Sequence, residues 1–261
     1  MNSKYHVYKN AQINYEFTQT NSSKTLICLH GFLEFKEIFD FITYIDLGDS
    51  YNILKIDLLG QGKSDSIGYI HSMEDQADMI FDICTALGIN NLTILGHSMG
   101  GYVALAFLEL YPEFVNQIIL LNSSAKEDSS LRKQNRLRGI ELVKKNTNIF
   151  IQMAVTNLFT DLDKIRLANE IRNFKSKAVL QTTQGVIANM YGMKDRKDRC
   201  YLLFNSTPIH YIYGSEDNLI PPNEILEETK NSNVILHSID GGHMLWLEQP
   251  LKIKDLLKKI L

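Results

Sequence analysis

A serine flanked by glycines stands in the stretch TILGHSMGGYVALAF, residues 93–107. Ser98 lies two residues after Gly96 and two before Gly100, between an apolar run and a segment with helical spacing. A serine held on a tight strand-to-helix turn needs glycines at both places, because the two backbones approach too closely there for side chains. This pattern predicts that Ser98 exposes its hydroxyl as a nucleophile. The alternative is that the glycines and the serine simply form a turn. The rest of the chain decides, because a serine is unreactive until a base, an acid and oxyanion donors surround it.

The base that such a serine requires is one of seven histidines: His6, His30, His71, His97, His210, His237 and His243. His243 is the strongest candidate, because it follows the strand pattern NVILHS and comes directly after Gly241 and Gly242. The two glycines allow a loop that carries an imidazole over the carboxyl edge of a sheet. We therefore predict that His243 is the general base.

The remaining histidines have simpler interpretations. His210 and His237 lie inside strand patterns, so we expect packed or solvated side chains. His6 and His71 have no supporting sequence context. His97 is adjacent to the nucleophile and should point away from it.

The third residue must be a carboxylate that orients the imidazole and stabilises its cation. Asp217 meets this requirement, because the strand pattern PIHYIYG ends at Gly214 and GSEDNLIPP continues into a loop at the same edge. Glu216 is the rival, but Gly214-x-x-Asp217 leaves enough loop to turn inward. Serine, aspartate, histidine is also the chain order expected when all three follow successive strands.

Two backbone N–H groups are expected to hold a developing oxyanion. Met99 follows the nucleophile and opens the helix, so its N–H can point at the reacting oxygen. The second donor should come from the loop after an earlier strand, where TLICLHGFLE supplies His30-Gly31-Phe32. We predict that Phe32 donates its N–H and that His30 fixes this loop by hydrogen bonds.

Short apolar or alternating runs predict the strands that position these residues. The runs are AQINYEF, TLICLH, YNILKID, NLTILG, VNQIILLN, PIHYIYG and NVILHSI. Helical patterns lie among them, namely MEDQADMIFDICTAL, GYVALAFLELY, PPNEILEETK and PLKIKDLLKKIL. Alternating strands and helices predict an α/β fold with a mostly parallel sheet and helices on both faces. The first strand or two follow each other without a helix and should form an antiparallel edge.

The alternation stops between about residues 123 and 205, where helical patterns continue without a convincing strand. Such a segment is too long for a plain loop. We predict a helical cap inserted between two strands, above the carboxyl edge of the sheet. The expected domains are a core of residues 1–122 and 206–261 and a cap of residues 123–205.

Charge is divided unevenly between these two parts. The whole chain has a formal charge of -3 at pH 7, which gives no reason to expect nucleic acid or a membrane as partner. Residues 126–199 hold 16 Lys and Arg against 8 Asp and Glu, a net of +8, which leaves -11 for the remainder. The segment LRKQNRLRGIELVKK is either a solvated helix face or a group of cations that attracts an anionic substrate to the pocket.

Cys28, Cys84 and Cys200 are odd in number and far apart, which fits neither a disulfide framework nor a set of metal ligands. We expect three free thiols. The N-terminal sequence MNSKYHVYKN lacks the basic and apolar regions of a secretory signal, so the expected location is the cytoplasm. The sequence does not indicate an oligomeric state.

In combination, the motifs resemble the α/β-hydrolase fold family, in its capped branch. They are His30-Gly31, Asp57-x-x-Gly60-x-Gly62-x-Ser64, Gly-His-Ser-Met-Gly-Gly, Gly214-x-x-Asp217 with Pro221, and Gly242-His243 followed by Glu248 and Pro250. The resemblance covers about residues 24–256. Leu59 and Gln61 depart from the Pro and His that relatives often carry, and FLEFKEIF lacks a frequent Trp. These departures concern the surroundings of the pocket.

The resemblance implies a serine hydrolase that cleaves a small or medium carboxylic ester, thioester or lactone through an acyl-enzyme, without metal or organic cofactor. A carbon–carbon bond hydrolase or an acyltransferase would share the same catalytic residues. A menaquinone-pathway synthase is a narrower alternative, although relatives with that activity carry Arg where this chain has Tyr102. A non-enzymatic ligand receptor is the alternative from another class.

Overall fold

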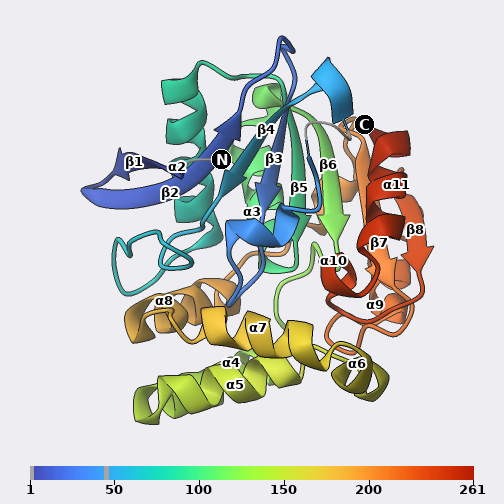
Figure 1. Ribbon diagram of the computed structural model, residues 1–261. Helices are drawn as coiled ribbons and strands as arrows, with labels where there is room; N and C mark the ends of the chain where they lie inside the picture. The colour runs from blue at the N-terminus through green and yellow to red at the C-terminus, as the bar shows by residue number, and fades with distance from the viewer. Residues whose placement is uncertain (1–2, 44–46) are drawn as a thin grey trace.

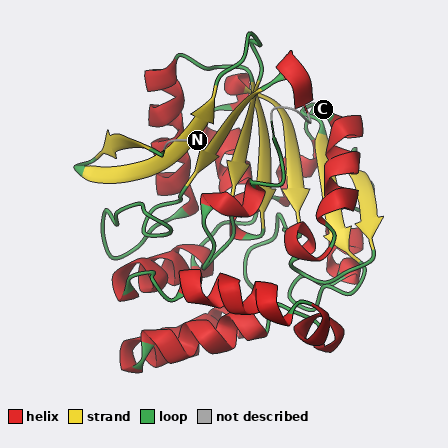
Figure 2. Cartoon of the chain, viewed as in Figure 1, coloured by secondary structure: helices red, strands yellow, loops and turns green. Residues whose placement is uncertain are grey.

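The computed structural model describes residues 3–43 and 47–261 and shows a twisted sheet between two layers of helices (Figure 1, Figure 2). In the described residues the sheet has eight strands in the order β1-β2-β4-β3-β5-β6-β7-β8. Their bounds are β1 (Lys4–Tyr8), β2 (Ala11–Thr18), β3 (Thr25–Leu29), β4 (Asn52–Ile56), β5 (Leu92–His97), β6 (Val115–Leu121), β7 (Ile209–Gly214) and β8 (Ile235–Ile239).

The strands from β3 to β8 run parallel to their neighbours, whereas β2 pairs antiparallel with β4 and β1 pairs antiparallel with β2. This arrangement confirms the predicted α/β fold and its antiparallel edge. β3, β4 and β5 are buried along their whole length, which explains their continuous apolar sequences. The edge strand β1 has the sequence KYHVY and is mostly exposed, so it lacks the apolar pattern that predicts the other strands.

Helices cover both faces of this sheet. In Figure 1, α2 (Met73–Leu87), α3 (Met99–Leu110) and α9 (Pro222–Glu228) lie on one face and α11 (Pro250–Ile260) on the other. α2 has the predicted bounds because its ends carry clear signals: Ser72 and Asp75 form a capping box, and Gly88 takes φ +68° after the last turn. The shorter elements are η1 (Lys36–Phe39), η2 (Gly48–Ser50), η3 (Pro112–Phe114), η4 (Cys200–Phe204) and α10 (Leu245–Glu248).

The chain between β6 and β7 forms a helical layer below the carboxyl edge of the sheet in Figure 1. Its helices are α4 (Ser130–Lys145), α5 (Thr147–Thr156), α6 (Asp161–Arg166), α7 (Ala168–Ala178) and α8 (Thr183–Lys194). These helices are called the cap below. The division of the chain into a core of residues 1–122 and 206–261 and a cap of residues 123–205 remains our proposal.

Helix α8 packs against the rest of the molecule through its backbone. A Cβ atom at Gly185 would lie 2.0 Å from the carbonyl oxygen of Gly60, and one at Gly192 would lie 1.7 Å from that of His71. Between them, Asn189 donates a hydrogen bond of 2.8 Å to the carbonyl of Leu59. Glycine at these positions therefore permits a contact that no side chain would allow.

Both ends of the cap insertion are also attached by buried charged groups. The Glu228 carboxylate accepts hydrogen bonds from Ser124 Oγ (2.6 Å) and from the N–H of Ala125 (3.0 Å), where the chain leaves β6. Arg199 is 2% exposed and donates 2.7 Å bonds to Glu74 and Glu109, where the chain returns. These contacts fix the cap above the sheet.

No helix in residues 3–43 and 47–261 combines the length and the apolar character needed to cross a membrane.

We predict that Gly192→Ala destabilises the protein, although alanine is the better helix former by about 1 kcal/mol. The added Cβ collides with the His71 carbonyl, and such overpacking costs about 1–3 kcal/mol. Urea denaturation measures the loss. Gly68→Ala is the matched control, because nothing lies within 4 Å of its added Cβ. Equal stability of the two variants would contradict the packing argument.

Candidate active site

Ser98 occupies a strained turn between β5 and α3. Its backbone has φ +49° and ψ −115°, a conformation that residues with a side chain rarely adopt. The Ser98 N–H donates to the carbonyl of Leu121 (2.9 Å), and the Ser98 carbonyl accepts from Ser123 Oγ (2.8 Å). The neighbouring strand β6 thus holds the turn in place.

The glycines on either side of Ser98 are required by the closeness of the backbone. A Cβ at Gly96 would lie 2.4 Å from the carbonyl oxygen of Gly100, and a Cβ at Gly100 would lie 2.1 Å from that of Leu29. The motif therefore makes more than a flexible turn: it forces the serine outward from the end of β5.

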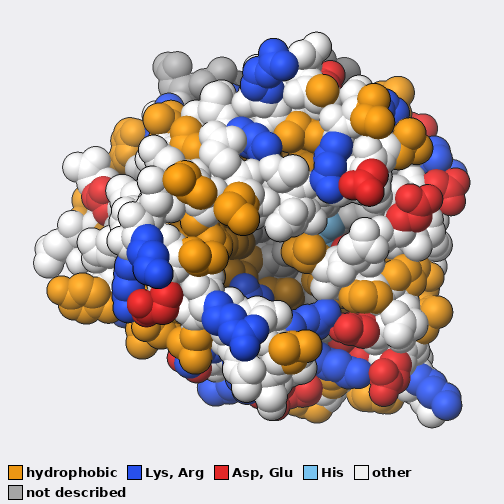
Figure 3. All heavy atoms as spheres, turned by 90° about the horizontal axis from the view of Figure 1, so that it is seen from below, with side chains coloured by type: hydrophobic (Ala, Val, Ile, Leu, Met, Phe, Trp, Pro, Cys, Tyr) orange, Lys and Arg blue, Asp and Glu red, His pale blue; other side chains and the backbone are white. Residues whose placement is uncertain are grey.

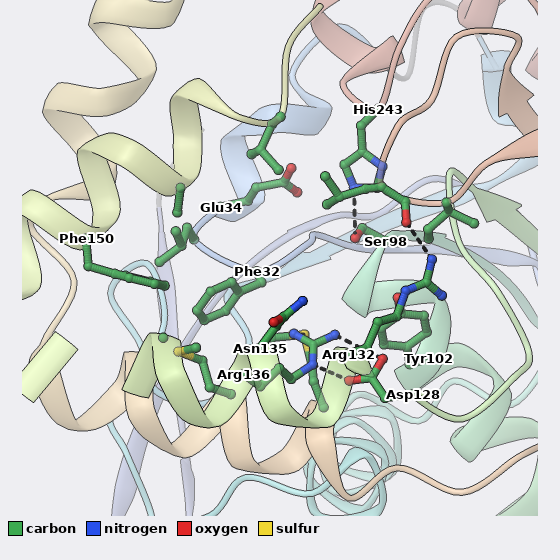
Figure 4. Close-up of a pocket in the computed structure, with 18 residues that line it drawn as sticks. Phe32, Glu34, Ser98, Tyr102, Asp128, Arg132, Asn135, Arg136, Phe150 and His243 are labelled. Atoms are coloured by element: carbon green, nitrogen blue, oxygen red, sulfur yellow. Dashed lines mark hydrogen bonds and ion pairs between the residues drawn. The ribbon is translucent and has the colours of Figure 1, made fainter. Parts of the chain in front are cut away.

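His243 and Asp217 complete a hydrogen-bonded chain with this serine. His243 Nε2 lies 3.0 Å from Ser98 Oγ, and His243 Nδ1 lies 2.8 Å from Asp217 Oδ2. Figure 4 shows the imidazole directly facing the serine hydroxyl. The structure thus brings together three residues predicted from separate strand ends.

Asp217 is buried and fully hydrogen-bonded. Its Oδ1 accepts from the N–H groups of Leu219 (2.8 Å) and Ile220 (3.0 Å). Burial alone would raise the pKa of Asp217, but the attraction of His243 and the hydrogen bonds outweigh burial and hold this pKa below its ordinary value. Asp217 therefore stays ionised beside the imidazole, whereas the side chain of the rival Glu216 is exposed to solvent.

Asn122 is a residue of the site that the sequence analysis missed. It follows β6 with φ +45°, and its Nδ2 donates to Asp217 Oδ2 (2.9 Å) and to the carbonyl of Gly242 (3.1 Å). An asparagine tolerates this left-handed conformation better than most residues. The signal in the sequence was an asparagine directly after a buried strand, at the same sheet edge as the other site residues.

The loop that carries His243 is supported by Glu248. The Glu248 carboxylate accepts the N–H of Gly242 and the N–H of Met244 (3.2 Å). Its burial raises the pKa of this carboxyl above the ordinary value. Glu248 thus holds the backbone on both sides of the imidazole.

The predicted oxyanion donors lie on two neighbouring elements. The N–H of Phe32 has no hydrogen-bond acceptor within the described ranges 3–43 and 47–261. Met99 is the first residue of α3, where N–H groups lack intrahelical acceptors, and the Ser98 side chain does not cap the helix. Both backbone groups are thus available to a bound oxyanion, although their role remains a prediction.

We call residues 30–33 the oxyanion loop. His30 accepts the N–H of Leu58 at Nε2 (3.0 Å), so its proton is on Nδ1, which donates to the Gly31 carbonyl (2.8 Å). This confirms that His30 fixes the loop. Gln61, one of the departures from the family pattern, accepts the N–H of Leu33 (2.6 Å) and supports the same loop.

The other histidines lie away from Ser98 Oγ. His6 bonds to Asp82 near the surface (2.6 Å), and His210 and His237 bond to each other across β7 and β8 (3.0 Å). His71 is buried beneath the cap, where burial lowers its pKa to about 4. None of these four contacts the site.

A cavity of about 310 Å³ opens above Ser98 and His243 (Figure 4). Figure 3 shows the molecule from the cap side, with a central hollow whose walls are largely hydrophobic. The apolar part of the lining consists of Phe32, Leu33, Phe150, Ala154, Leu158, Met190, Met193, Leu219 and Ile220. Ser98 and His243 therefore face a cavity whose lining is largely apolar.

Two arginines of α4 line the same cavity. Arg132 binds Glu224 (2.9 Å) and the carbonyl of Leu219 (2.9 Å), while Arg136 binds the buried Asp128. Asp128 is shared with Arg196, and the two guanidinium groups outweigh burial and lower its pKa. Each of these cations therefore has a carboxylate partner: Glu224 for Arg132, and Asp128 for Arg136 and Arg196.

Nothing in the described residues suggests a metal centre, since they contain no group of three or more His, Cys, Asp or Glu arranged to hold an ion. The three cysteines are free thiols, as predicted.

Comparison with known proteins identifies the family. A family model described as the alpha/beta hydrolase fold matches residues 24–250 of this chain. The chain belongs to the α/β-hydrolase fold family. This finding confirms the resemblance drawn from the motifs.

Several proteins similar to this α/β hydrolase are named as esterases or hydrolases. A thermophilic esterase from Thermogutta terrifontis is 27% identical, with a TM-score of 0.85 over 96% of this chain and 93% of that one. An esterase from Exiguobacterium antarcticum, 20% identical with a TM-score of 0.86 over 100% and 99% of the two chains, shares the fold. The 2-hydroxy-6-oxononadienedioate/2-hydroxy-6-oxononatrienedioate hydrolase of Burkholderia vietnamiensis is 28% identical over 183 residues, 66% of this chain and 62% of that protein. The chain is a hydrolase of the α/β fold.

We predict that Asp217→Asn slows the reaction of Ser98 with a fluorophosphonate by on the order of 10³-fold, because the imidazole loses the partner that fixes its tautomer. Mass spectrometry of the labelled protein measures the rate. Glu216→Gln is the control and should react like the wild type. If Glu216→Gln is the slow variant, the carboxylate has been assigned to the wrong residue.

Proposed function

We propose that this protein is a serine hydrolase that cleaves a small or medium carboxylic ester, or a related thioester or lactone, through an acyl-enzyme. The observation that carries the proposal is the chain Ser98 Oγ, His243, Asp217, with distances of 3.0 and 2.8 Å, at the floor of an apolar cavity. Ser98 is the nucleophile, His243 the general base and acid, and Asp217 the residue that orients and stabilises the imidazolium.

In the first half of the reaction, His243 Nε2 accepts the proton of Ser98 while Oγ forms a bond to the acyl carbon. The carbonyl electron pair moves to oxygen, where the N–H groups of Phe32 and Met99 stabilise the negative charge. When the carbonyl re-forms, the bond to the leaving group breaks, and His243 returns the proton to the departing oxygen. The acyl group then remains on Ser98.

In the second half, water takes the place of the leaving alcohol. His243 removes a proton from water as its oxygen attacks the acyl carbon, and the same N–H groups stabilise the second oxyanion. Collapse of this intermediate breaks the bond to Ser98 Oγ, which regains its proton from His243. The products are a carboxylic acid and the free enzyme, and no cofactor enters the balance.

Two further observations support an ester substrate. The cavity of about 310 Å³ has an apolar lining from the cap and from the loop after β7, which suits an acyl chain of modest size. The esterases from Thermogutta terrifontis and Exiguobacterium antarcticum cover nearly the whole chain. The chain thus shares its fold, over nearly its whole length, with proteins named for this activity.

A second candidate, hydrolysis of a substrate that carries carboxylates, is favoured by Arg132 and Arg136 at the cavity wall. The relative from Burkholderia vietnamiensis is named for a dioate substrate, which is an anion. The catalytic residues would be the same, and the two candidates differ in what the arginines recognise.

We predict that Ser98→Ala removes ester turnover by several orders of magnitude, as for other nucleophilic serines, without loss of stability. The hydroxyl contributes little packing, and the turn is held by backbone bonds. The assay is a panel of acyl esters of increasing chain length, with thioesters and lactones included, and circular dichroism reports the fold. More than a tenth of wild-type activity in the folded variant would refute the proposed nucleophile.

We predict that kcat/KM for a carboxylate-bearing ester falls with salt more than kcat/KM for its neutral analogue. Raising the ionic strength from 0.1 to 1 M shortens the Debye length from about 10 to about 3 Å, which screens the charges of Arg132 and Arg136. In Arg132→Gln the difference in salt dependence of kcat/KM between the two esters should be smaller than in the wild type. An identical salt response of the two esters in the wild type would mean that the cap charge is solvated surface only.

A further inference from the structure

Two buried side chains of opposite charge, Glu34 and His97, lie beside the site and take no part in the steps above. Glu34 is 1% exposed and His97 is 0% exposed, and His97 Nδ1 lies 2.9 Å from Glu34 Oε2. Burying an ion pair costs desolvation free energy, which is offset only where both partners are fully hydrogen-bonded. The hydrogen bonds of this pair therefore indicate what it stabilises.

The pair connects the two loops that meet at Ser98. Glu34 Oε2 accepts the N–H of Gly31 in the oxyanion loop, and Glu34 Oε1 accepts from Trp246 Nε1 (3.3 Å). On the other side, His97 Nε2 lies 3.0 Å from the backbone carbonyl of His243. The oxyanion loop and the backbone of the base are thus joined through two side chains.

These contacts determine the proton count of the pair. The carbonyl of His243 can only accept, so Nε2 of His97 carries a proton. Glu34 already accepts two N–H groups, from Gly31 and Trp246, which favours its ionised form. Nδ1 of His97 must then donate as well, which makes His97 an imidazolium paired with a carboxylate.

The backbone is shaped to admit this pair. A Cβ at Gly31 would lie 2.8 Å from Glu34 Oε2 and 3.0 Å from His97 Nδ1. Glycine at this position therefore allows the carboxylate and the imidazole to approach the oxyanion loop directly. Glu34 and His243 both line the cavity (Figure 4).

The electrostatic surroundings agree with an ionised pair. Burial alone would raise the pKa of Glu34 and lower that of His97, but their mutual attraction outweighs burial, so the pKa of Glu34 is lowered and that of His97 is raised. The other titratable groups that face them are His30 beside Glu34, and Asp217 and His243 beside His97. Asp217 adds to the stabilisation of the His97 cation.

We propose that Glu34 and protonated His97 are positioning residues, whose ion pair sets the oxyanion loop against the backbone of His243 so that the N–H donors face the substrate carbonyl oxygen while the base faces Ser98 Oγ. This inference rests on the function proposed above. Neither residue exchanges a proton with the substrate. Their loss should displace the donors without removing the nucleophile.

The test is Glu34→Gln, which keeps the shape of the side chain and removes its charge. The neutral His97 of this variant has one proton and cannot donate to both neighbours. We expect kcat per active site, counted by fluorophosphonate titration, to fall on the order of 10- to 100-fold with little change in KM, because a misplacement of about 1 Å has a cost of this size. Unchanged kcat per titrated site, even with a lower melting temperature, would overturn the proposal.

A double-mutant cycle separates a shared role from two independent ones. If the pair acts as a unit, His97→Asn combined with Glu34→Gln loses no more kcat than the worse single variant, whereas independent effects multiply. Asp82→Asn is the control, since it weakens the contact of α2 with His6 on the edge strand β1, and neither residue lines the cavity. If the loss of kcat in the double variant equals the product of the two single losses, the proposal that Glu34 and His97 act as a pair is refuted.

Nitrogen NMR of histidine-labelled protein tests the proton count directly. Well above pH 6.5, the ordinary pKa of histidine, both ring nitrogens of His97 should remain protonated in the wild type and only one in Glu34→Gln. A singly protonated His97 in the wild type would overturn the inference. Failure of the proposed function is distinguishable, because it would appear as ester turnover in Ser98→Ala.

Discussion

The backbone contact between β5 and α3 is the constraint on which the site depends. Gly96 of β5 lies so close to Gly100 of α3 that no side chain fits there, and between them Ser98 takes its strained conformation with positive φ. The strain is supported by hydrogen bonds from β6, and the β6 strand continues into Asn122, which in turn binds Asp217. The positions of Ser98 and Asp217 are therefore consequences of the same packing.

The parallel sheet explains how distant segments converge. β3, β5, β6, β7 and β8 all end at one edge, so the loops that follow them meet there without long connections. Under the proposed function, each loop supplies one part: oxyanion donor, nucleophile, supporting amide, carboxylate and base. The cap then closes the space above them, and α8 fits tightly because glycine backbones replace side chains at the contact.

Much of this arrangement could be predicted from the sequence, because apolar runs and glycine spacings are local signals. The strands that bear the site, helix α2 and the grouping of Ser98, Asp217 and His243 were of this kind. Asn122 and Glu34 were missed, since each acts through a partner far away in the chain. The pairing of Glu34 with His97 spans 63 residues, and no local pattern indicates that a charge will be buried against another.

The distances along the chain between the joined residues have a consequence for how the protein is made. The bond from His243 to Ser98 spans 145 residues, and that from Trp246 to Glu34 spans 212. Such non-local contacts form late in folding, because the entropy of closing a long loop must be overcome first. During synthesis Ser98 emerges well before β8, which lies at the edge of the sheet and is the last of the described strands. Under the proposed function, a nascent chain that ends before β8 lacks His243, and Ser98 gains its base only when the C-terminal segment docks.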